Sequence, residues 1–383
     1  MNFKAGLLIG LIFCGGFWGQ MIFDMNAWSH LAALPLLVLF VSLCLKQLSN
    51  PEENTLTPFA LISISVAGGL YLYPEATIFL GFGIFLLILV LIPGIGIEVN
   101  GAHRWLRIGP VGFQPSEIMK FITIVYVAGY SVRRLKDLQS HWFAFFKPAV
   151  LVVLVVSLIL MQPDLGTSAV IFVTVLGMLF VSGVHIRQFI LVIGLGFLGI
   201  LSLIYFVPWR WERIISFMDP WANQYEGGYQ LTLSLMAIGR GDWFGVGLGE
   251  GLMKLGYLPD AHTDFIFSIV VEEMGLFTAI IIIATLFFLS FRSFYIGRKA
   301  LQRNLYFGFF ISYGVAILIG LHTFINVGVA IGLLPTKGLT LPFISYGGTN
   351  LLIMCCLCAL VLRVDQETKS SMPAINIPRR VSL

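Results

Sequence analysis

The sequence predicts an all-α protein that crosses a membrane many times, with about ten transmembrane helices. The 383-residue chain is 58% hydrophobic and 11% charged, with a mean hydropathy of +0.93, whereas a soluble domain is about 25% charged. Apolar runs recur along the chain, each near the roughly 20 residues that cross a bilayer as a helix. The short alternating segments of a β-barrel are absent from the pattern. The net charge of +4 gives no reason to expect a nucleic-acid partner, because the basic residues lie between apolar runs.

From residue 76 onward the expected spans are well separated. They cover about 76–96, 117–132, 147–162, 166–183, 188–207, 265–291, 305–325 and 343–363. Three earlier apolar runs are short for a span and lie at about 5–23, 31–47 and 58–73. Counting two of them gives ten helices and an inside N-terminus; counting three gives eleven helices and an outside N-terminus. No cleavable signal peptide is evident, so we expect the first run to be retained.

The connections between spans predict the orientation. Those at 133–147, 183–188 and 291–304 are rich in Lys and Arg, and the positive-inside rule makes that side cytoplasmic. We therefore expect one membrane domain over 1–365 and a polar cytoplasmic tail over 366–383. The opposite side receives the connections 97–116, 162–166, 326–342 and a long loop between about 208 and 264.

The connection 97–116 and the helix after it carry charges on the outer side. Arg104 runs against the positive-inside rule and therefore calls for a functional explanation. Glu117 and Lys120 are three residues apart, so they share a helix face and can form an ion pair. The alternative is that the pair only neutralises itself near the interface, with Trp105 as an interfacial anchor.

Two further stretches place an acid or a base beside a turn. Asp164 lies in Gln162-Pro163-Asp164-Leu165-Gly166, where capping the next helix is a strong alternative to a functional role. Lys337 lies in a segment with two prolines and three glycines between 335 and 348, which indicates broken backbone at membrane depth. Such backbone is tolerated only where protein or a wet cavity surrounds it.

The long loop joins several different features. Trp209 to Arg213 alternates aromatic and basic residues, which suits an amphipathic segment in the headgroup layer. The glycine-rich run 239–251, with Arg240, lacks the Lys-Ser/Thr of a phosphate-binding loop, so we interpret it as tight backbone packing.

The loop ends at Asp260, His262 and Asp264, just before an apolar helix, where Asp264 could also act as a cap. Inside that helix we expect Glu272 to lean toward the Asp264 face and Glu273 to point away. Five cysteines lie in apolar runs, and their spacing indicates neither a disulfide framework nor a metal site.

Together these residues predict an outer cavity that combines cations with carboxylates. The mixture suits a substrate with an anionic head and a hydroxyl to deprotonate, such as a lipid-linked pyrophosphate sugar. The cations are Arg104, Lys120, Lys337 and Arg240, and the carboxylates are Asp264 and Glu117.

Seven motifs in order resemble the SEDS family (shape, elongation, division and sporulation) of membrane peptidoglycan glycosyltransferases. The resemblance covers about 76–363, while 1–75 matches poorly. The last motif is more similar to the division member of the family than to the elongation member. The chain departs from the common pattern at His103, Leu233, Thr349 and Asn350. The motifs are NGAHRW, QPSEIMK, QPDLGT, GYQLTLSLMAIGRG, GVGLGEG, LPDAHTDFIF and LPTKGLTLPFISYGG.

The resemblance implies a reaction and a set of roles. The 4-hydroxyl of lipid II attacks the anomeric carbon of the nascent glycan strand, lipid pyrophosphate leaves, and the α link becomes β. One general base is needed, and Asp264 matches the family's catalytic Asp. Asp260 is then left with a loop or capping role. The expected substrate-binding residues are Arg104, Trp105, Glu117, Lys120, Asp164, Arg240, His262 and Lys337.

The resemblance also implies partners and leaves alternatives open. It implies a single-span class B penicillin-binding protein, other division proteins and the bacterial inner membrane at the septum. A divalent cation, Mg or Mn, could assist the leaving group, although the sequence names no metal ligand. The alternatives are a lipid II flippase or transporter, the elongation polymerase, or a scaffold.

Overall fold

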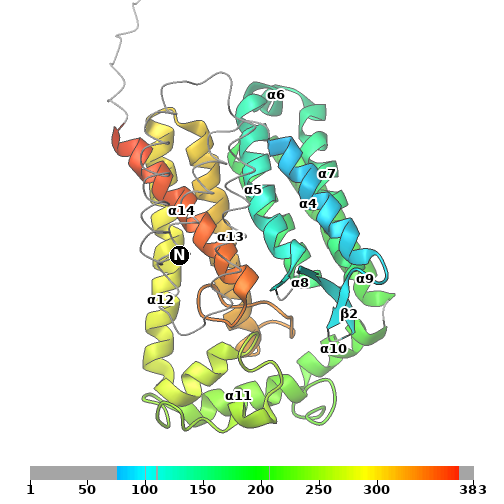
Figure 1. The fold of residues 1–383 in the computed structure, drawn as a ribbon, viewed down its shortest axis with the longest axis vertical. Coiled ribbons are helices and arrows are strands. Elements are labelled where there is room, and N and C mark those ends of the chain that lie inside the picture. The colour runs from blue at the N-terminus through cyan, green and yellow to red at the C-terminus, as the bar shows by residue number, and fades with distance from the viewer. Residues whose placement is uncertain (1–75, 100, 109–110, 207, 371–383) are drawn as a thin grey trace, which may run out of the picture. The chain divides into compact units, whose positions relative to one another are not determined.

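The computed structural model describes residues 76–370 except 100, 109, 110 and 207. The expected runs before residue 76 lie outside the described residues. The fold is a helical bundle with a small antiparallel sheet and short helices at one end (Figure 1).

The first half of the described chain forms α4 (Ala76–Leu91), β1 (Ile97–Val99), β2 (Ala102–Ile108), β3 (Val111–Phe113), α5 (Pro115–Arg133), α6 (Leu135–Ser140), α7 (Trp142–Met161), α8 (Leu165–Val181) and α9 (Ile186–Tyr205). The second half forms α10 (Pro208–Met218), α11 (Tyr229–Gly241), a π-helical turn (Met253–Tyr257), α12 (Ile266–Gln302), α13 (Tyr306–Ala330) and α14 (Gly348–Ser370).

Every run expected to span from residue 76 onward forms a helix. Four stretches of the described chain are long and apolar enough to cross a membrane, namely Phe143–Met161, Ile266–Gln302, Tyr306–Ala330 and Gly348–Ser370. Shorter apolar helices lie at Ile78–Leu91, Leu165–Val181 and Ile186–Gly196. The protein is therefore a polytopic helical membrane protein.

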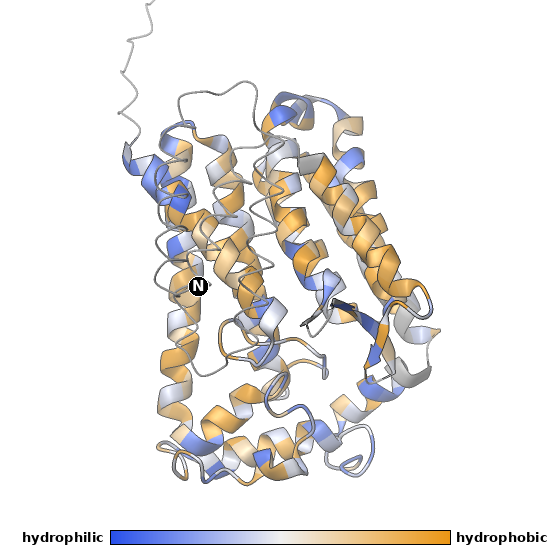
Figure 2. Ribbon diagram, in the orientation of Figure 1, coloured by the Kyte–Doolittle hydropathy of each residue, from blue (hydrophilic) through white to orange (hydrophobic). Residues whose placement is uncertain are grey.

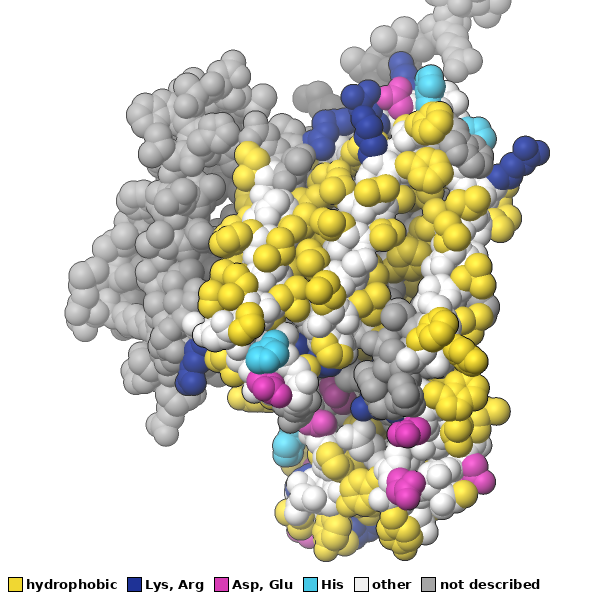
Figure 3. Space-filling view, turned by 90° about the vertical axis from the view of Figure 1, so that its right-hand side faces the viewer, with side chains coloured by type: hydrophobic (Ala, Val, Ile, Leu, Met, Phe, Trp, Pro, Cys, Tyr) yellow, Lys and Arg dark blue, Asp and Glu magenta, His cyan; other side chains and the backbone are white. Residues whose placement is uncertain are grey.

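The surface has the polarity that such a protein needs. Apolar residues dominate the middle of the helices, and hydrophilic residues gather toward the ends (Figure 2). The space-filling view shows an apolar band with a cluster of Lys and Arg side chains at its upper end (Figure 3). Exposed apolar side chains on α7 and α9 contribute to this lipid-facing character, among them Phe143, Val150, Ile190, Leu195 and Leu198.

Helix α13 is the centre of the bundle. It packs against α12, α5, α8 and α14, and its buried side chains include both apolar residues and the polar His322, Thr323 and Asn326. Polar side chains in such a place need partners or a function, because an unpaired polar group in an apolar interior is costly.

The small sheet corrects the all-α expectation. β2 pairs with β1 and β3, and Val99 faces Ala102 across the first turn. The sequence signal for this hairpin is Asn100-Gly101, the dipeptide favoured in two-residue hairpin loops. The sheet matters for function because β2 carries Arg104 and Trp105.

The segment expected to be one long loop, 208–264, contains α10, α11 and the π-helical turn. Two further boundaries also differ from expectation. Helix α12 continues through the basic stretch expected to be a loop at 291–304 and ends at Gln302. Helix α14 runs to Ser370, past the expected domain end at 365.

The glycine-rich run packs into a break in α12. Gly275 has φ +79°, which interrupts the helix. The carbonyls of Glu272 and Glu273 accept hydrogen bonds from the backbone N–H groups of Val246 (2.9 Å) and Gly247 (3.1 Å). The N–H of Leu276 donates to the carbonyl of Asp242 (2.9 Å). Tight backbone packing, as the sequence predicted for this run, thus satisfies the groups freed by the break.

Two glycines of α11 allow a matched test of this packing. A Cβ at Gly241 would lie 2.0 Å from the carbonyl oxygen of Val271, whereas a Cβ at Gly239 would meet nothing within 4 Å. We expect Gly241→Ala to cost about 1–3 kcal/mol through overpacking. Gly239→Ala should be neutral or stabilising, because Ala favours a helix.

Thermal unfolding in detergent would compare the two variants. A transition for Gly241→Ala at the wild-type temperature would show that the α11–α12 contact is looser than described.

Candidate active site

The turn before α12 is organised by the backbone of Asp260. Asp260 has φ +54°, a left-handed conformation that Asp tolerates better than most residues. Its carbonyl accepts hydrogen bonds from the N–H groups of Thr263 (3.1 Å), Asp264 (3.1 Å) and Phe265 (3.3 Å). The N-cap of α12 is Phe265, and no side chain caps that helix. The capping alternative for Asp264 is therefore wrong.

The connection between α13 and α14 packs onto this turn. The hydroxyl of Ser345 donates to the carbonyl of Thr263 (2.6 Å) and accepts from the N–H of Leu341 (2.6 Å). The N–H of Tyr346 donates to the carbonyl of His262 (2.9 Å). The broken backbone is thus surrounded by protein, as the sequence predicted.

Gly338 brings that connection against the Asp264 side chain. A Cβ at Gly338 would lie 3.0 Å from Oδ2 of Asp264. This is tighter than nine in ten real Cβ contacts, so a larger residue here would require the Asp264 side chain to shift by a few tenths of an ångström.

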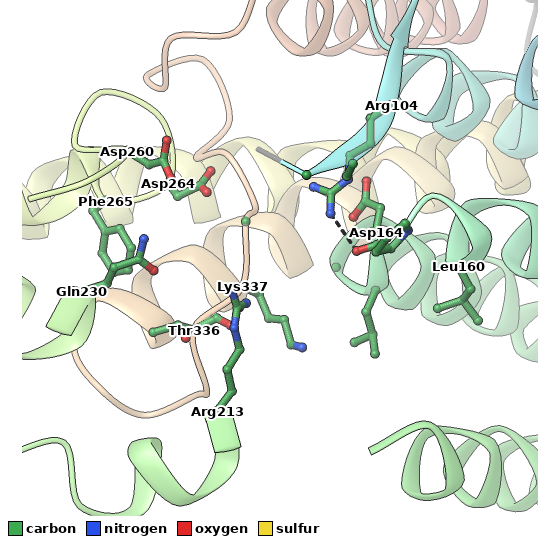
Figure 4. A pocket seen from close by; sticks show the side chains of 16 residues that line it. Arg104, Leu160, Asp164, Arg213, Gln230, Asp260, Asp264, Phe265, Thr336 and Lys337 are labelled. Carbon is green, nitrogen blue, oxygen red and sulfur yellow. Dashed lines mark hydrogen bonds between the residues drawn. The ribbon is translucent and has the colours of Figure 1, made fainter. Parts of the chain in front are cut away.

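A cavity of about 510 Å³ opens in front of Asp264. Helices α8, α10 and α11, the sheet, the Asp260 turn and the α13–α14 connection all contribute to its wall (Figure 4). Its charged lining residues are Arg104, Asp164, Arg213, Asp260, Asp264 and Lys337.

Arg104 and Asp164 form one side of the cavity. Nε of Arg104 donates to the carbonyl of Gln162 (2.9 Å), and Nη2 donates to that of Pro163 (2.7 Å). The guanidinium group therefore lies beside Asp164 (Figure 4). Asp164 caps α8 by accepting from the N–H of Thr167 (3.0 Å). The capping interpretation is thus confirmed, and the same residue also lines the cavity.

Arg213 of α10 approaches from the other side. Its Nη1 lies 3.4 Å from the carbonyl oxygen of Thr336, to which it donates. Desolvation and the positive charge of Arg104 lower the pKa of Arg213. Cationic groups from elements far apart in the sequence therefore converge on one space, an arrangement that favours an anion between them.

Asp264 has the electrostatics of a general base. Burial raises its pKa to about 7, with further increases from the negative charges of Asp260 and Asp164, while Arg104 opposes the rise. A carboxyl group with a pKa near the working pH can take up a proton and release it again.

Glu117 and Lys120 form the expected ion pair, with Lys120 Nζ 2.6 Å from Glu117 Oε2. Lys120 is almost fully buried, and its Nζ lies 3.1 Å from Nε2 of His322. Neither member of the pair lines the cavity. The structure therefore does not bring these two predicted site residues to the substrate space.

Arg240 also lies away from the cavity lining. Its Nη1 lies 3.0 Å from Oε1 of Glu272, and that carboxylate also accepts from the backbone N–H groups of Leu252 (3.0 Å) and Met253 (3.3 Å). Glu272 is held by these donors and does not line the cavity with Asp264. Glu273 has the partner that its position required, because its Oε1 lies 2.5 Å from Nζ of Lys254.

Trp105 and His262 neighbour the site without lining it. Trp105 pairs with Ile97 across β1 and β2. The His262 side chain is exposed, and the residue contributes its backbone carbonyl to the contact with Tyr346.

Sequence reasoning missed several lining residues, among them Asp260, Arg213 and Gln230. Asp260 received only a loop or capping role; its backbone does shape the turn, but its carboxyl group also lines the cavity. Arg213 was assigned to the membrane surface, and Gln230 was passed over within its motif. Arg213 and Gln230 lie on helices α10 and α11, and helical spacing does not tell which neighbour each face meets. Asp260 lies in a turn, where spacing gives no signal.

The fold and the site together define a polytopic helical membrane protein with a charged cavity at one end of its bundle. The chain belongs to the FtsW/RodA/SpoVE family of cell cycle proteins, whose model matches residues 60–370.

Relatives within this family are closely similar. The chain is 50% identical over 283 residues to a probable peptidoglycan glycosyltransferase FtsW of Saccharophagus degradans, covering 74% of this chain and 73% of the relative. It is 48% identical over 279 residues to a protein of the same name from Allochromatium vinosum, covering 73% of this chain and 70% of the relative.

Solved structures share the fold. A chain from a peptidoglycan synthase complex, studied for the coordination of polymerization and crosslinking, superimposes with a TM-score of 0.63 at 28% identity. The match covers 88% of this chain and 98% of that chain. The rod shape determining protein RodA of Thermus thermophilus matches with a TM-score of 0.52 at 27% identity, over 90% and 98% of the two chains.

The raised pKa of Asp264 can be tested directly. Dicyclohexylcarbodiimide modifies protonated carboxyl groups in apolar surroundings, so labelling of Asp264 should fall as the pH rises through about 7. Asp260→Asn removes a neighbouring negative charge and should move that fall to lower pH. Mass spectrometry of the labelled peptide gives both midpoints.

Glu250→Gln, which changes a carboxyl group that does not line the cavity, is the control and should leave the midpoint in place. An unchanged midpoint in Asp260→Asn would contradict the described proximity of the two carboxyl groups.

Proposed function

We propose that this protein is a peptidoglycan glycosyltransferase of cell division, which polymerises lipid II into β-1,4 glycan strands. The observation that carries the proposal is the cavity itself, in which a carboxyl group with a pKa of about 7 faces Arg104, Arg213 and Lys337. Family membership and the names of the relatives support the same activity. They favour the division type over the elongation type.

In the proposed reaction, Asp264 is the general base. It takes the proton of the 4-hydroxyl of lipid II as that oxygen bonds to the anomeric carbon of the nascent strand. The bond from that carbon to the lipid pyrophosphate breaks, and the pyrophosphate leaves with the electron pair. A single displacement inverts the link from α to β. No general acid is required, because pyrophosphate is a stable leaving group.

The cations of the cavity have the complementary task. Arg104, Arg213 and Lys337 would bind the pyrophosphate groups and stabilise the negative charge that grows on the leaving group. Arg104 and Arg213 are anchored to backbone carbonyls, so little reorganisation is needed when the charge develops. In this scheme Asp164 orients Arg104, Asp260 tunes Asp264, and Trp105 and His262 shape the rim.

A divalent cation is compatible with the donors at hand. Among the described residues no group of three or more His, Cys, Asp or Glu side chains could hold a metal ion by itself. Mg²⁺, however, commonly takes one or two carboxylates together with substrate phosphates. We propose that Mg²⁺ or Mn²⁺ would be held by the substrate pyrophosphate together with a carboxylate of the cavity lining, and that it would supply positive charge to the leaving group.

The orientation and setting follow from the charges. The Lys and Arg cluster lies at the end of the bundle opposite the cavity (Figures 1 and 3), and the positive-inside rule assigns that end to the cytoplasm. We propose a ten-helix arrangement in the bacterial inner membrane, with the cavity on the outer face and action at the division septum. A single-span class B penicillin-binding protein is the proposed partner, supported by the similar chain from a synthase complex.

The central test uses purified protein with a class B penicillin-binding partner and labelled lipid II. Wild type should produce glycan chains, and Asp264→Asn should lower the rate by about 100-fold or more, the typical contribution of a general base. Asp260→Asn keeps the base and should remain active. Polymerisation at the wild-type rate by Asp264→Asn would remove that residue from its role. If lipid II crossed vesicle bilayers without being polymerised, the protein would be a flippase.

The rate should also depend on pH in a defined direction. The base must be ionised, so polymerisation should rise as the pH increases through about 7 and then level off. In Asp260→Asn the rise should occur at lower pH, because one neighbouring negative charge is lost. Rates from pH 5.5 to 8.5 would reveal the shift, and identical profiles would count against the tuning role.

A further inference from the structure

Two buried polar side chains of α13 hold the back of the active site. His322 and Asn326 lie one helical turn apart and are 0% and 1% exposed. Nδ2 of Asn326 donates to the carbonyls of Leu339 (2.6 Å) and Asp264 (2.9 Å). Nδ1 of His322 lies 3.2 Å from the carbonyl oxygen of Thr340. Neither side chain lines the cavity, so both act behind the residues that face the substrate.

The neighbours of His322 fix its tautomer. Lys120 is paired with Glu117, so its amino group is an ammonium, which can only donate. Nε2 of His322, 3.1 Å from that ammonium, must therefore accept. The carbonyl of Thr340 can only accept, so Nδ1 must carry the proton and donate. One neutral tautomer of the imidazole satisfies both contacts.

We propose that His322 is a positioning residue for the glycosyl transfer, held by Lys120 in the tautomer that binds Thr340. The Thr340 bond and the two Asn326 bonds fix the segment 337–341 against the Asp264 turn. This places Gly338 at the Asp264 carboxyl group and holds Lys337 in the cavity lining. Lys120 then acts through His322 and not on the pyrophosphate. The inference rests on the proposed function.

The expected effect is large because the segment lies close to Asp264. A Cβ at Gly338 would be 3.0 Å from Oδ2 of Asp264, and a displacement of about 1 Å at a reacting centre can cost about 100-fold in rate. Release of the segment would also hydrate Asp264 and lower its pKa toward the usual carboxyl value. The charged groups that act on the pKa of Asp264, which are Asp260, Asp164 and Arg104, lie outside this segment and stay in place in the variants below. Lys337 belongs to the segment, and Arg213 bonds to Thr336 beside it.

Two substitutions at His322 separate its two contacts. The amide nitrogen of Asn occupies nearly the position of Nδ1, so His322→Asn keeps a donor for Thr340 and loses the contact with Lys120. The amide of Gln reaches the position of Nε2, so His322→Gln keeps an acceptor for Lys120 and loses the donor. We expect His322→Asn to keep kcat within about threefold of wild type. His322→Gln should lower kcat by about 10- to 100-fold, with KM for lipid II changed less than about threefold.

The pH profile distinguishes positioning from simple packing. His322→Gln should also move the midpoint of the kcat profile to lower pH, while His322→Asn should leave it near 7. Ser290→Ala is the control, because Ser290 makes a buried bond to the carbonyl of Ala316 (2.7 Å) away from the cavity. It should leave kcat and the midpoint unchanged. Equal kcat values for the two His322 variants would overturn the proposal. A fall in activity that matches a fall in the yield of folded protein would overturn it as well.

Hydrogen exchange tests the same contact without activity. In His322→Gln the amides of Leu339, Leu341 and Tyr346 should exchange faster than in wild type, while those of α12 and α13 stay protected. If wild type failed to polymerise lipid II, the proposed function would be wrong. The exchange data would still test whether His322 holds the segment 337–341. If wild type were active and exchange in His322→Gln were unchanged, the proposed positioning role of His322 would be wrong.

Discussion

The docking of the α13–α14 connection onto the turn before α12 is the contact on which the site depends. Both pieces are irregular backbone at the end of a membrane bundle, and each would leave polar groups unpaired by itself. They pair with one another through Ser345 and Tyr346, and with the bundle through Asn326. The same contacts place Gly338 beside Asp264 and Lys337 in the lining of the cavity. The contacts that pair the backbone groups of the two segments are therefore the same contacts that position Asp264, the proposed general base.

The charges of the cavity show how low polarity serves the proposed chemistry. Burial among apolar helices raises the pKa of Asp264 to about 7, which a solvated carboxyl group would not reach. The cations come from β2, α10 and the α13–α14 connection, and backbone carbonyls orient both arginines. Two other acid–base pairs, Arg240 with Glu272 and Lys254 with Glu273, stabilise the broken helix α12 instead. Charged residues that line the cavity are thus available for the proposed chemistry, whereas charged residues that pair with one another stabilise the fold.

Much of the helical framework could be predicted because hydropathy is a local property. Each apolar run from residue 76 onward became a helix, and the broken backbone near Pro335 was expected from its prolines and glycines. The hairpin at Asn100-Gly101 was missed because the surrounding strands are short and mixed in polarity. Arg104, Asp164, Asp264 and Lys337 were predicted and do meet in one cavity. Lys120 and Arg240 were predicted with them but lie elsewhere, since a charge pattern does not name its partner.

The sequence by itself determined that the chain is a helical membrane protein, and its ordered motifs pointed to a charged outer site with Asp264 as the base. These conclusions depend on composition, run length and motif order, all of which are local or linear. Only the tertiary structure decided which cations face Asp264, that Asp260 raises its pKa, and that Lys120 meets His322 behind the cavity. Such choices depend on contacts between residues as far apart as 120 and 322. Helical periodicity gives the face of a side chain but not the neighbour that the face will meet.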